Sequence, residues 1–249
     1  MSMRALVAEA VGTFVLVAFG SLSVVAAASI STSAADFASF VTIVVPFGFG
    51  LGLMAAIAIG GHASGGHFNP AVTLAALFDG RVTPQSAIGY VVAQVIGGLA
   101  GSLVIVLTTS TQLVQLTTNH PGNIGGADLF GNELRAFGIE LVLTAVFVAV
   151  ILTATRNYAR QAILIIPLTL VAIHFAAMHL SGASVNPVRS LSPAVVSGTY
   201  ESLWVYLIAP MVGSIVGWGL YAFLTPPSDE VSVEIEEDLF DDEDDTDDD

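Results

Sequence analysis

The chain contains the stretch His62-Ala63-Ser64-Gly65-Gly66-His67-Phe68-Asn69-Pro70, and its pattern returns 117 residues later as His179-Leu180-Ser181-Gly182-Ala183-Ser184-Val185-Asn186-Pro187. Both copies read His-x-Ser-Gly-x-x-x-Asn-Pro, which we call the repeated motif. Asn is a strong helix N-cap and Pro is favoured at the first helical position, so each Asn-Pro pair predicts the start of a helix. A repeat of this length in one register predicts a chain built from two related halves.

The composition is that of an integral membrane protein. Hydrophobic residues make up 54% of the 249 residues and charged residues only 11%, whereas an ordinary globular domain has about 25% charged residues. An all-α membrane protein is therefore predicted, with spans of about 20 residues each. Six stretches meet this requirement: Arg4–Ser29, Phe40–Gly60, Pro84–Leu107, Glu133–Thr155, Gln161–Leu180 and Ser202–Leu224.

Two shorter apolar stretches follow the two copies of the repeated motif. Asn69–Phe78 and Asn186–Ser197 are about half a span long, so both are predicted to be re-entrant half-helices. Each half of the chain, about residues 4–107 and 133–224, then holds three spans and one half-helix. Because three is odd, the second half enters the membrane inverted relative to the first, and the half-helices are expected to meet near the midplane.

Other residues follow the same repeat. Glu9 in the first span is matched by Glu140 in the fourth. Both carboxylates are predicted to anchor the backbone before the half-helices, and His62 and His179 are predicted to brace the same backbone. Glycines four residues apart favour close helix packing in the third and sixth spans: Gly97 with Gly101, and Gly213 with Gly217.

Charge is distributed unevenly along the chain. The segment Asp229–Asp249 holds 14 acidic residues and no basic ones, which leaves seven acidic residues and six arginines elsewhere. We expect residues 1–225 to form the membrane domain and residues 226–249 a disordered acidic tail. This tail, together with the absence of lysine, predicts a halophilic host, such as a haloarchaeon, whose cytosolic cations screen the carboxylates. A solvated or partner-binding extension is the alternative.

Arginine placement predicts the orientation in the membrane. One side holds four of the six arginines and both termini, and is predicted to be cytoplasmic: Arg4, Arg81, Arg156 and Arg160. Arg135, at the start of the fourth span, is the exception. The near-neutral body predicts no nucleic-acid partner, and a chain without cysteine has no thiol-ligated metal. The expected surroundings are the lipid bilayer of the cell membrane.

The Ser-Gly-x-x-x part of each motif is poor helix material, so its backbone is predicted to be extended. Unwound backbone at membrane depth is tolerated only where it is buried in protein or lines water. Backbone carbonyls of six residues are therefore expected to line a pore: Gly65, Gly66, His67, Gly182, Ala183 and Ser184.

The two asparagines are expected to act at the centre of this pore. The side-chain oxygens of Asn69 and Asn186 cap the half-helices, which leaves their amide N–H groups for the lumen. Each half-helix start carries roughly half a positive charge, so cations, including hydronium, are repelled. A water molecule that accepts hydrogen bonds from both amides points its hydrogens outward, and a proton cannot hop through.

With these features, residues 4–224 resemble the aquaporins of the major intrinsic protein family. The first Asn-Pro is followed by Ala71, as is usual in the family, and the second by Val188, which keeps the cap and the donor. The resemblance implies one pore per subunit, a homotetramer, passive transport without enzymatic activity, and neither cofactor nor metal. It also implies a water-channel-like member of prokaryotic origin.

Counting from the two motifs places the family's selectivity filter at Phe49, His174, Ala183 and Arg189. An aromatic residue, a histidine that narrows the lumen and a cationic donor resemble the water-selective set. Glycerol-conducting members tend to have Gly at the His position and Trp at the Phe position. The predicted function is therefore a water channel that excludes protons and ions. The alternative is a channel for glycerol or other small neutral solutes.

An alternative function, from another class of protein, is that of an intramembrane hydrolase. Ser64 with His62 or His67 nearby would fit a serine nucleophile and its base. The same Ser-Gly pair recurs at Ser181, however, and a catalytic site has no need to be duplicated. An ion channel is disfavoured because two positive helix ends and Arg189 face the lumen.

Overall fold

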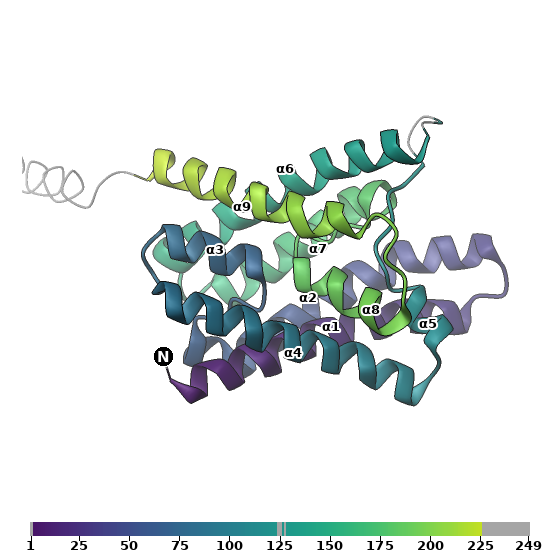
Figure 1. Cartoon of the computed structure of the whole chain (residues 1–249), viewed down its shortest axis with the longest axis horizontal. Coiled ribbons are helices and arrows are strands. Elements are labelled where there is room, and N and C mark those ends of the chain that lie inside the picture. The colour runs from purple at the N-terminus through teal and green to yellow at the C-terminus, as the bar shows by residue number, and fades with distance from the viewer. Residues whose placement is uncertain (1, 124–125, 127, 226–249) are drawn as a thin grey trace, which may run out of the picture.

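The computed structural model describes residues 2–123, 126 and 128–225 (Figure 1), and the predicted acidic tail lies outside these residues. The described chain is a bundle of long helices with shorter helices between them. The helices are α1 (Met3–Ile30), α2 (Ala34–Ser64), α3 (Pro70–Phe78), α4 (Pro84–Thr108), α5 (Thr111–Gln115), α6 (Leu129–Asn157), α7 (Ala162–Ser181), α8 (Pro187–Ser197) and α9 (Leu203–Leu224).

The predicted spans are confirmed as helices. Within the described residues, α1, α2, α4, α6, α7 and α9 are long and apolar enough to cross a membrane. Their ends differ from the prediction in places, as α2 begins at Ala34 rather than at Phe40. The cause is Ser33, whose hydroxyl accepts a hydrogen bond from the Asp36 N–H at 3.1 Å and caps the helix. Hydropathy locates the apolar centre of a span but not such a polar first turn.

Two long helices continue into the repeated motif. Helix α2 runs to Ser64 and α7 to Ser181, so the His-x-Ser part of each copy is helical. The segment predicted to be unwound therefore begins at the glycine of each copy and not at the serine. The glycine after each serine ends its helix in the left-handed conformation, with φ of 91° at Gly65 and 85° at Gly182. Only four residues in each copy, 65–68 and 182–185, are therefore left for the half-loops.

The half-helices α3 and α8 enter the bundle from opposite ends. In Figure 1, α3 lies in the half of the bundle that contains the N-terminus, and α8 lies in the other half, beside α5. Both pack against α4 and α9, and they also contact each other. The inverted repeat with two re-entrant half-helices is thus confirmed.

Close helix packing relates the two halves. A Cβ atom on Gly97 of α4 would overlap the carbonyl oxygen of Ala10 on α1. A Cβ atom on Gly213 of α9 would overlap the carbonyl oxygen of Leu141 on α6. The pairs α1–α4 and α6–α9 are therefore equivalent backbone-to-backbone contacts, as the glycine spacing predicts.

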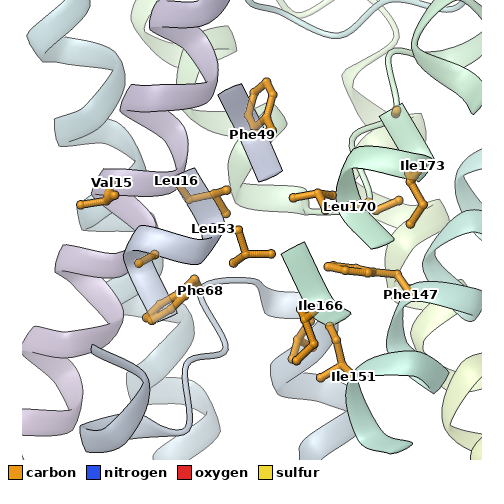
Figure 2. Close-up of a cluster of buried hydrophobic side chains, with 14 of the residues drawn as sticks. Val15, Leu16, Phe49, Leu53, Phe68, Phe147, Ile151, Ile166, Leu170 and Ile173 are labelled. Atoms are coloured by element: carbon orange, nitrogen blue, oxygen red, sulfur yellow. The ribbon is translucent and has the colours of Figure 1, made fainter. Parts of the chain in front are cut away.

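A cluster of buried hydrophobic side chains lies between α1, α2, α6 and α7. Figure 2 shows Phe49 at one end of this cluster and Ile151 at the other, with Leu16, Leu53 and Leu170 between them. All five also line an internal cavity. The cluster is therefore part of the wall of this cavity as well as part of the core.

Candidate pore and filter

The cavity has a volume of about 330 Å3 and reaches both half-loops. Its lining includes Phe49, His174 and Arg189 at one end, Asn69 and Asn186 in the middle, and Arg81 and Thr155 at the other end. Most of the remaining wall is aliphatic or aromatic. Polar groups are therefore concentrated at the half-loops and at the two ends, which we call the Arg189 end and the Arg81 end.

The motif asparagines join the two half-loops to each other. Asn69 Nδ2 donates to the Val185 carbonyl at 2.8 Å, and Asn186 Nδ2 donates to the Phe68 carbonyl at 2.9 Å. The side-chain oxygens cap α3 and α8 by accepting from the N–H groups two residues on, at 2.9 and 3.0 Å. Because an amide nitrogen carries two hydrogens, each asparagine keeps one N–H for the cavity. The other N–H is occupied by the cross-loop bond, which no feature of the sequence predicts.

The prediction that the half-loops are extended is wrong. Three of the four residues in each half-loop have left-handed backbone angles. The φ angles are 91°, 70° and 49° at Gly65, Gly66 and Phe68, and 85°, 49° and 46° at Gly182, Ala183 and Val185. Each left-handed residue before Asn gives its carbonyl to the opposite asparagine and its N–H to a buried carboxylate. A β-branched residue such as Val185 rarely adopts positive φ, so these bonds hold a strained backbone in place.

Glu9 and Glu140 are fully buried and bind the half-loop of their own repeat. Glu9 accepts from Ser64 Oγ at 2.6 Å, His67 N at 2.9 Å, Phe68 N at 2.7 Å and Gln94 Nε2 at 2.7 Å. Glu140 accepts from Ser181 Oγ at 2.7 Å, Ser184 N at 2.8 Å and Val185 N at 2.8 Å. The repeated serines are therefore partners of the carboxylates.

The two motif histidines lie away from the half-loops. His62 is exposed in a surface groove beside Met3 and Arg4. His179 is exposed as well, and its Nε2 lies 2.8 Å from Thr42 Oγ1 on α2. The bracing role predicted for these histidines falls to other side chains.

Three polar residues that the sequence analysis missed support the half-loops instead. Tyr90 donates its hydroxyl to the Ser64 carbonyl at 2.9 Å, and Gln94 bonds Glu9. Asn119, in the connector between α5 and α6, donates to the Gly182 carbonyl at 2.9 Å. An amide in an apolar span is a signal that would have identified Gln94, whereas a polar connector gives no such signal for Asn119.

The predicted filter residues Phe49, His174 and Arg189 converge at one end of the cavity. The rings of Phe49 and His174 stack with centroids 4.9 Å apart and 16° between their planes. Arg189 Cζ lies 4.3 Å from the centroid of the Phe49 ring. Ala183, the fourth predicted member, is fully buried in the half-loop and does not line this cavity.

The predicted filter residues His174 and Arg189 offer a hydrogen-bond acceptor and a donor. His174 Nδ1 lies 2.9 Å from the Leu170 carbonyl, and because a carbonyl only accepts, Nδ1 carries the proton. In the neutral ring, Nε2 is then an acceptor. His174 Nε2 and Arg189 Nε are both buried, and neither has a hydrogen-bond partner in the part of the chain that the structure describes. A small ligand that both donates and accepts would satisfy them.

The predicted pore-lining carbonyl residues fall into two groups. Gly65, Gly66, His67 and Ser184 line the cavity, whereas Gly182 does not, and its carbonyl is bonded to Asn119. The first half-loop therefore contributes more of the predicted residues to the cavity wall than the second.

Arg81 ties the end of α3 to the helices around it. It pairs with Asp79 at 2.6 Å and donates to Thr155 Oγ1 at 2.6 Å and to the Leu152 carbonyl at 3.1 Å. It also donates to the Tyr221 hydroxyl at 3.3 Å. This side chain therefore fixes one mouth of the cavity, beyond the orientation signal it provides in the sequence.

Comparisons with known proteins agree with this architecture. The chain is 39% identical over 230 residues to aquaporin Z of Photorhabdus laumondii, covering 89% of this chain and 97% of the relative. It is 37% identical to glycerol uptake facilitator protein-like 6 of Lactiplantibacillus plantarum, covering 86% and 94%. The aquaglyceroporin of Plasmodium falciparum shares the fold, with a TM-score of 0.75, 22% identity, and coverage of 88% of this chain and 94% of that one. The profile of the family described as major intrinsic protein matches residues 1–221. The chain is therefore a multi-pass membrane protein and belongs to the major intrinsic protein family of passive channels.

Proposed function

We propose that this channel conducts water in preference to glycerol and excludes protons and ions. The observation that carries the proposal is the filter, where His174 and Arg189 both pack against Phe49. The filter sets an acceptor, His174 Nε2, and a donor, Arg189 Nε, in an apolar surrounding. Water satisfies both atoms and is small, whereas a three-carbon polyol needs more room beside the ring.

Ion and proton exclusion follow from the junction of the half-loops. The starts of α3 and α8 meet through Asn69 and Asn186, and each brings the positive end of a helix dipole. Arg189 adds a full positive charge at one end of the passage. One N–H of each asparagine remains for a water molecule at the junction, which sets the orientation that blocks proton hopping.

Conduction of glycerol or other small neutral solutes is the second candidate. It is supported by the 37% identity to a protein named as a glycerol uptake facilitator-like protein. The identity to aquaporin Z is similar, at 39%, so the relatives do not decide between the solutes. The filter geometry favours water.

Proteoliposomes with the purified full chain test the proposal. Osmotic shrinkage should be faster than in protein-free liposomes. Glycerol permeability should be at least roughly tenfold below water permeability, a ratio that corresponds to about 1.4 kcal/mol. Glycerol flux that rivals water flux would overturn the preference for water.

A pair of histidine variants in the same assay locates the selectivity. His174→Ala should raise glycerol relative to water permeability by roughly tenfold, because it removes the ring that narrows the filter. His179→Ala, on the same helix but exposed, is the matched control and should behave as the wild type.

We also infer that the Arg81 end faces the cytoplasm of the cell. The N-terminus of α1 and the last turn of α9 lie at the same end of the bundle (Figure 1). Arg81 and Arg156 gather there too, since both donate to Tyr221 in that last turn. Protease protection in right-side-out vesicles tests this orientation.

A homotetramer, which the family resemblance implies, is the inferred assembly. Large apolar side chains are exposed along α1 and α2, including Phe19, Phe47 and Ile59. Lipid or a neighbouring subunit would cover them. Light scattering in detergent distinguishes one subunit from four.

The serine hydrolase reading finds no support in the bonding of its serines. Ser64 Oγ donates to Glu9, and Ser181 Oγ donates to Glu140. Both hydroxyls therefore serve the half-loop anchors in the same way, and the repeat gives them one structural role.

A further inference from the structure

One amide of the connector between α5 and α6 reaches into the second repeat. Asn119 is 6% exposed, and its Oδ1 accepts from Arg189 Nη1 and from Ser190 Oγ, the latter at 2.7 Å. Its Nδ2 donates to the Gly182 carbonyl at 2.9 Å. One side chain thus joins the start of the second half-loop to the first turn of α8.

The backbone around Asn119 is itself held against the bundle. The Gly122 N–H donates to the Leu180 carbonyl at 3.0 Å, and a Cβ at Gly122 would overlap the His179 carbonyl. On the other side of Asn119, the Thr117 carbonyl accepts from Arg189 Nη1 at 3.5 Å. The connector is therefore fixed on both sides of the amide, which makes Asn119 a defined support.

Arg189 has neutral oxygens as its side-chain partners. In the described part of the chain its hydrogen-bond acceptors are Asn119 Oδ1 and the Thr117 carbonyl, and it forms no ion pair with a carboxylate. A neutral acceptor fixes the direction of the guanidinium but does not cancel its charge. A carboxylate in the same place would hold the side chain and weaken its repulsion of cations.

We propose that Asn119 is a positioning residue of the selectivity filter. It holds the Arg189 guanidinium against Phe49 and leaves its positive charge unpaired. This inference rests on the proposed water channel and adds a determinant from outside the motifs. The two roles of Asn119 have separate consequences. Without the amide, Arg189 is no longer held in place, and larger solutes can pass the filter. With a carboxylate in its place, Arg189 is still held, but its charge repels cations less.

Proteoliposomes of the full chain with Asn119→Ala, Asn119→Asp and His120→Ala test both consequences. Asn119→Ala should raise the glycerol-to-water permeability ratio by roughly three- to tenfold, because Arg189 loses its main hydrogen bond. Asn119→Asp should keep the ratio near the wild type but raise proton flux severalfold. His120→Ala changes the exposed neighbouring residue and should leave both readouts unchanged.

The outcomes are distinct from those that test water selectivity. The glycerol-to-water permeability ratio of the wild type tests the proposed function. The change of this ratio from the wild type to each variant tests the role of Asn119. An Asn119→Ala protein that is folded, with both ratio and proton flux unchanged, would overturn the positioning role. If Asn119→Ala does not fold, Asn119→Asp carries the test, and a wild-type proton flux in that variant overturns the proposal.

Discussion

The first half-loop, residues 65–68, and the second half-loop, residues 182–185, share one backbone path but differ in how it is held. Both are left-handed at the same three positions. The first uses glycine at two of the three, where positive φ costs little. The second uses glycine only at Gly182 and places Ala183 and Val185 at the others. The second half-loop therefore carries more backbone strain, at roughly 1–3 kcal/mol for each such residue.

Support is also distributed differently. Glu9 has four donors, one of them Gln94 on the neighbouring helix, whereas Glu140 has three. The second half-loop instead receives Asn119 from the connector. The half-loop next to the filter is thus held from outside its own repeat, and the other is held from within. The difference suggests that the two equivalent carboxylates, Glu9 and Glu140, maintain the fold, whereas Asn119, which has no equivalent in the first half, positions the filter.

The largest expected effect comes from removing the carboxylates. Glu9→Ala and Glu140→Ala each leave two backbone N–H groups and a serine hydroxyl buried without an acceptor. Each donor left without an acceptor costs roughly 1–3 kcal/mol, so the free energy of unfolding of each variant should fall by on the order of 4 kcal/mol or more. Glu9→Ala should lose more, since one N–H of Gln94 also loses its acceptor, while the other still donates to Thr73 Oγ1 at 2.9 Å.

Thermal unfolding in detergent, followed by circular dichroism, measures this loss. Glu201→Ala, an exposed carboxylate change, is the control and should unfold like the wild type. If Glu140→Ala proved the more damaging of the two, the count of donors would not describe the difference between the half-loops.

A smaller difference is expected between the two asparagines. Asn186 Oδ1 accepts from two backbone N–H groups, Val188 at 3.0 Å and Arg189 at 3.3 Å. Among the described residues, Asn69 Oδ1 accepts from the Ala71 N–H alone. Each alanine variant loses a cap and a cross-loop bond, about 2–3 kcal/mol together. Asn186→Ala should be the less stable by roughly 1 kcal/mol. A double-mutant cycle measures both the order and the coupling, and equal losses would contradict the assignment of two capped groups.

Local sequence signals account for the features that were predicted correctly. The Asn-Pro pairs mark the starts of α3 and α8 because capping is a one-turn effect, and hydropathy finds the spans because the bilayer selects apolar residues. The left-handed φ of Phe68 and Val185 was missed, because these side chains ordinarily avoid that region. Asn119 acts through partners far away in sequence, which no local pattern reveals, whereas Gln94 could have been identified as an amide within an apolar span.

The smallest effect is expected when glycine and alanine are exchanged between Gly66 and Ala183, which occupy equivalent positions in the two half-loops. Gly66→Ala should lower the stability by about 1 kcal/mol, because alanine at a φ of 70° is strained and its Cβ would lie 3.2 Å from Gly61 Cα. Ala183→Gly should raise it by roughly 0.5–1 kcal/mol, since glycine relieves strain but adds entropy to the unfolded chain. Chemical unfolding in mixed micelles measures both, with Ala63→Gly as a helical control that should destabilise. Opposite signs for the two exchanges support the view that strain is concentrated in the second half-loop. A destabilising Ala183→Gly would instead mean that the methyl group packs usefully beside the filter.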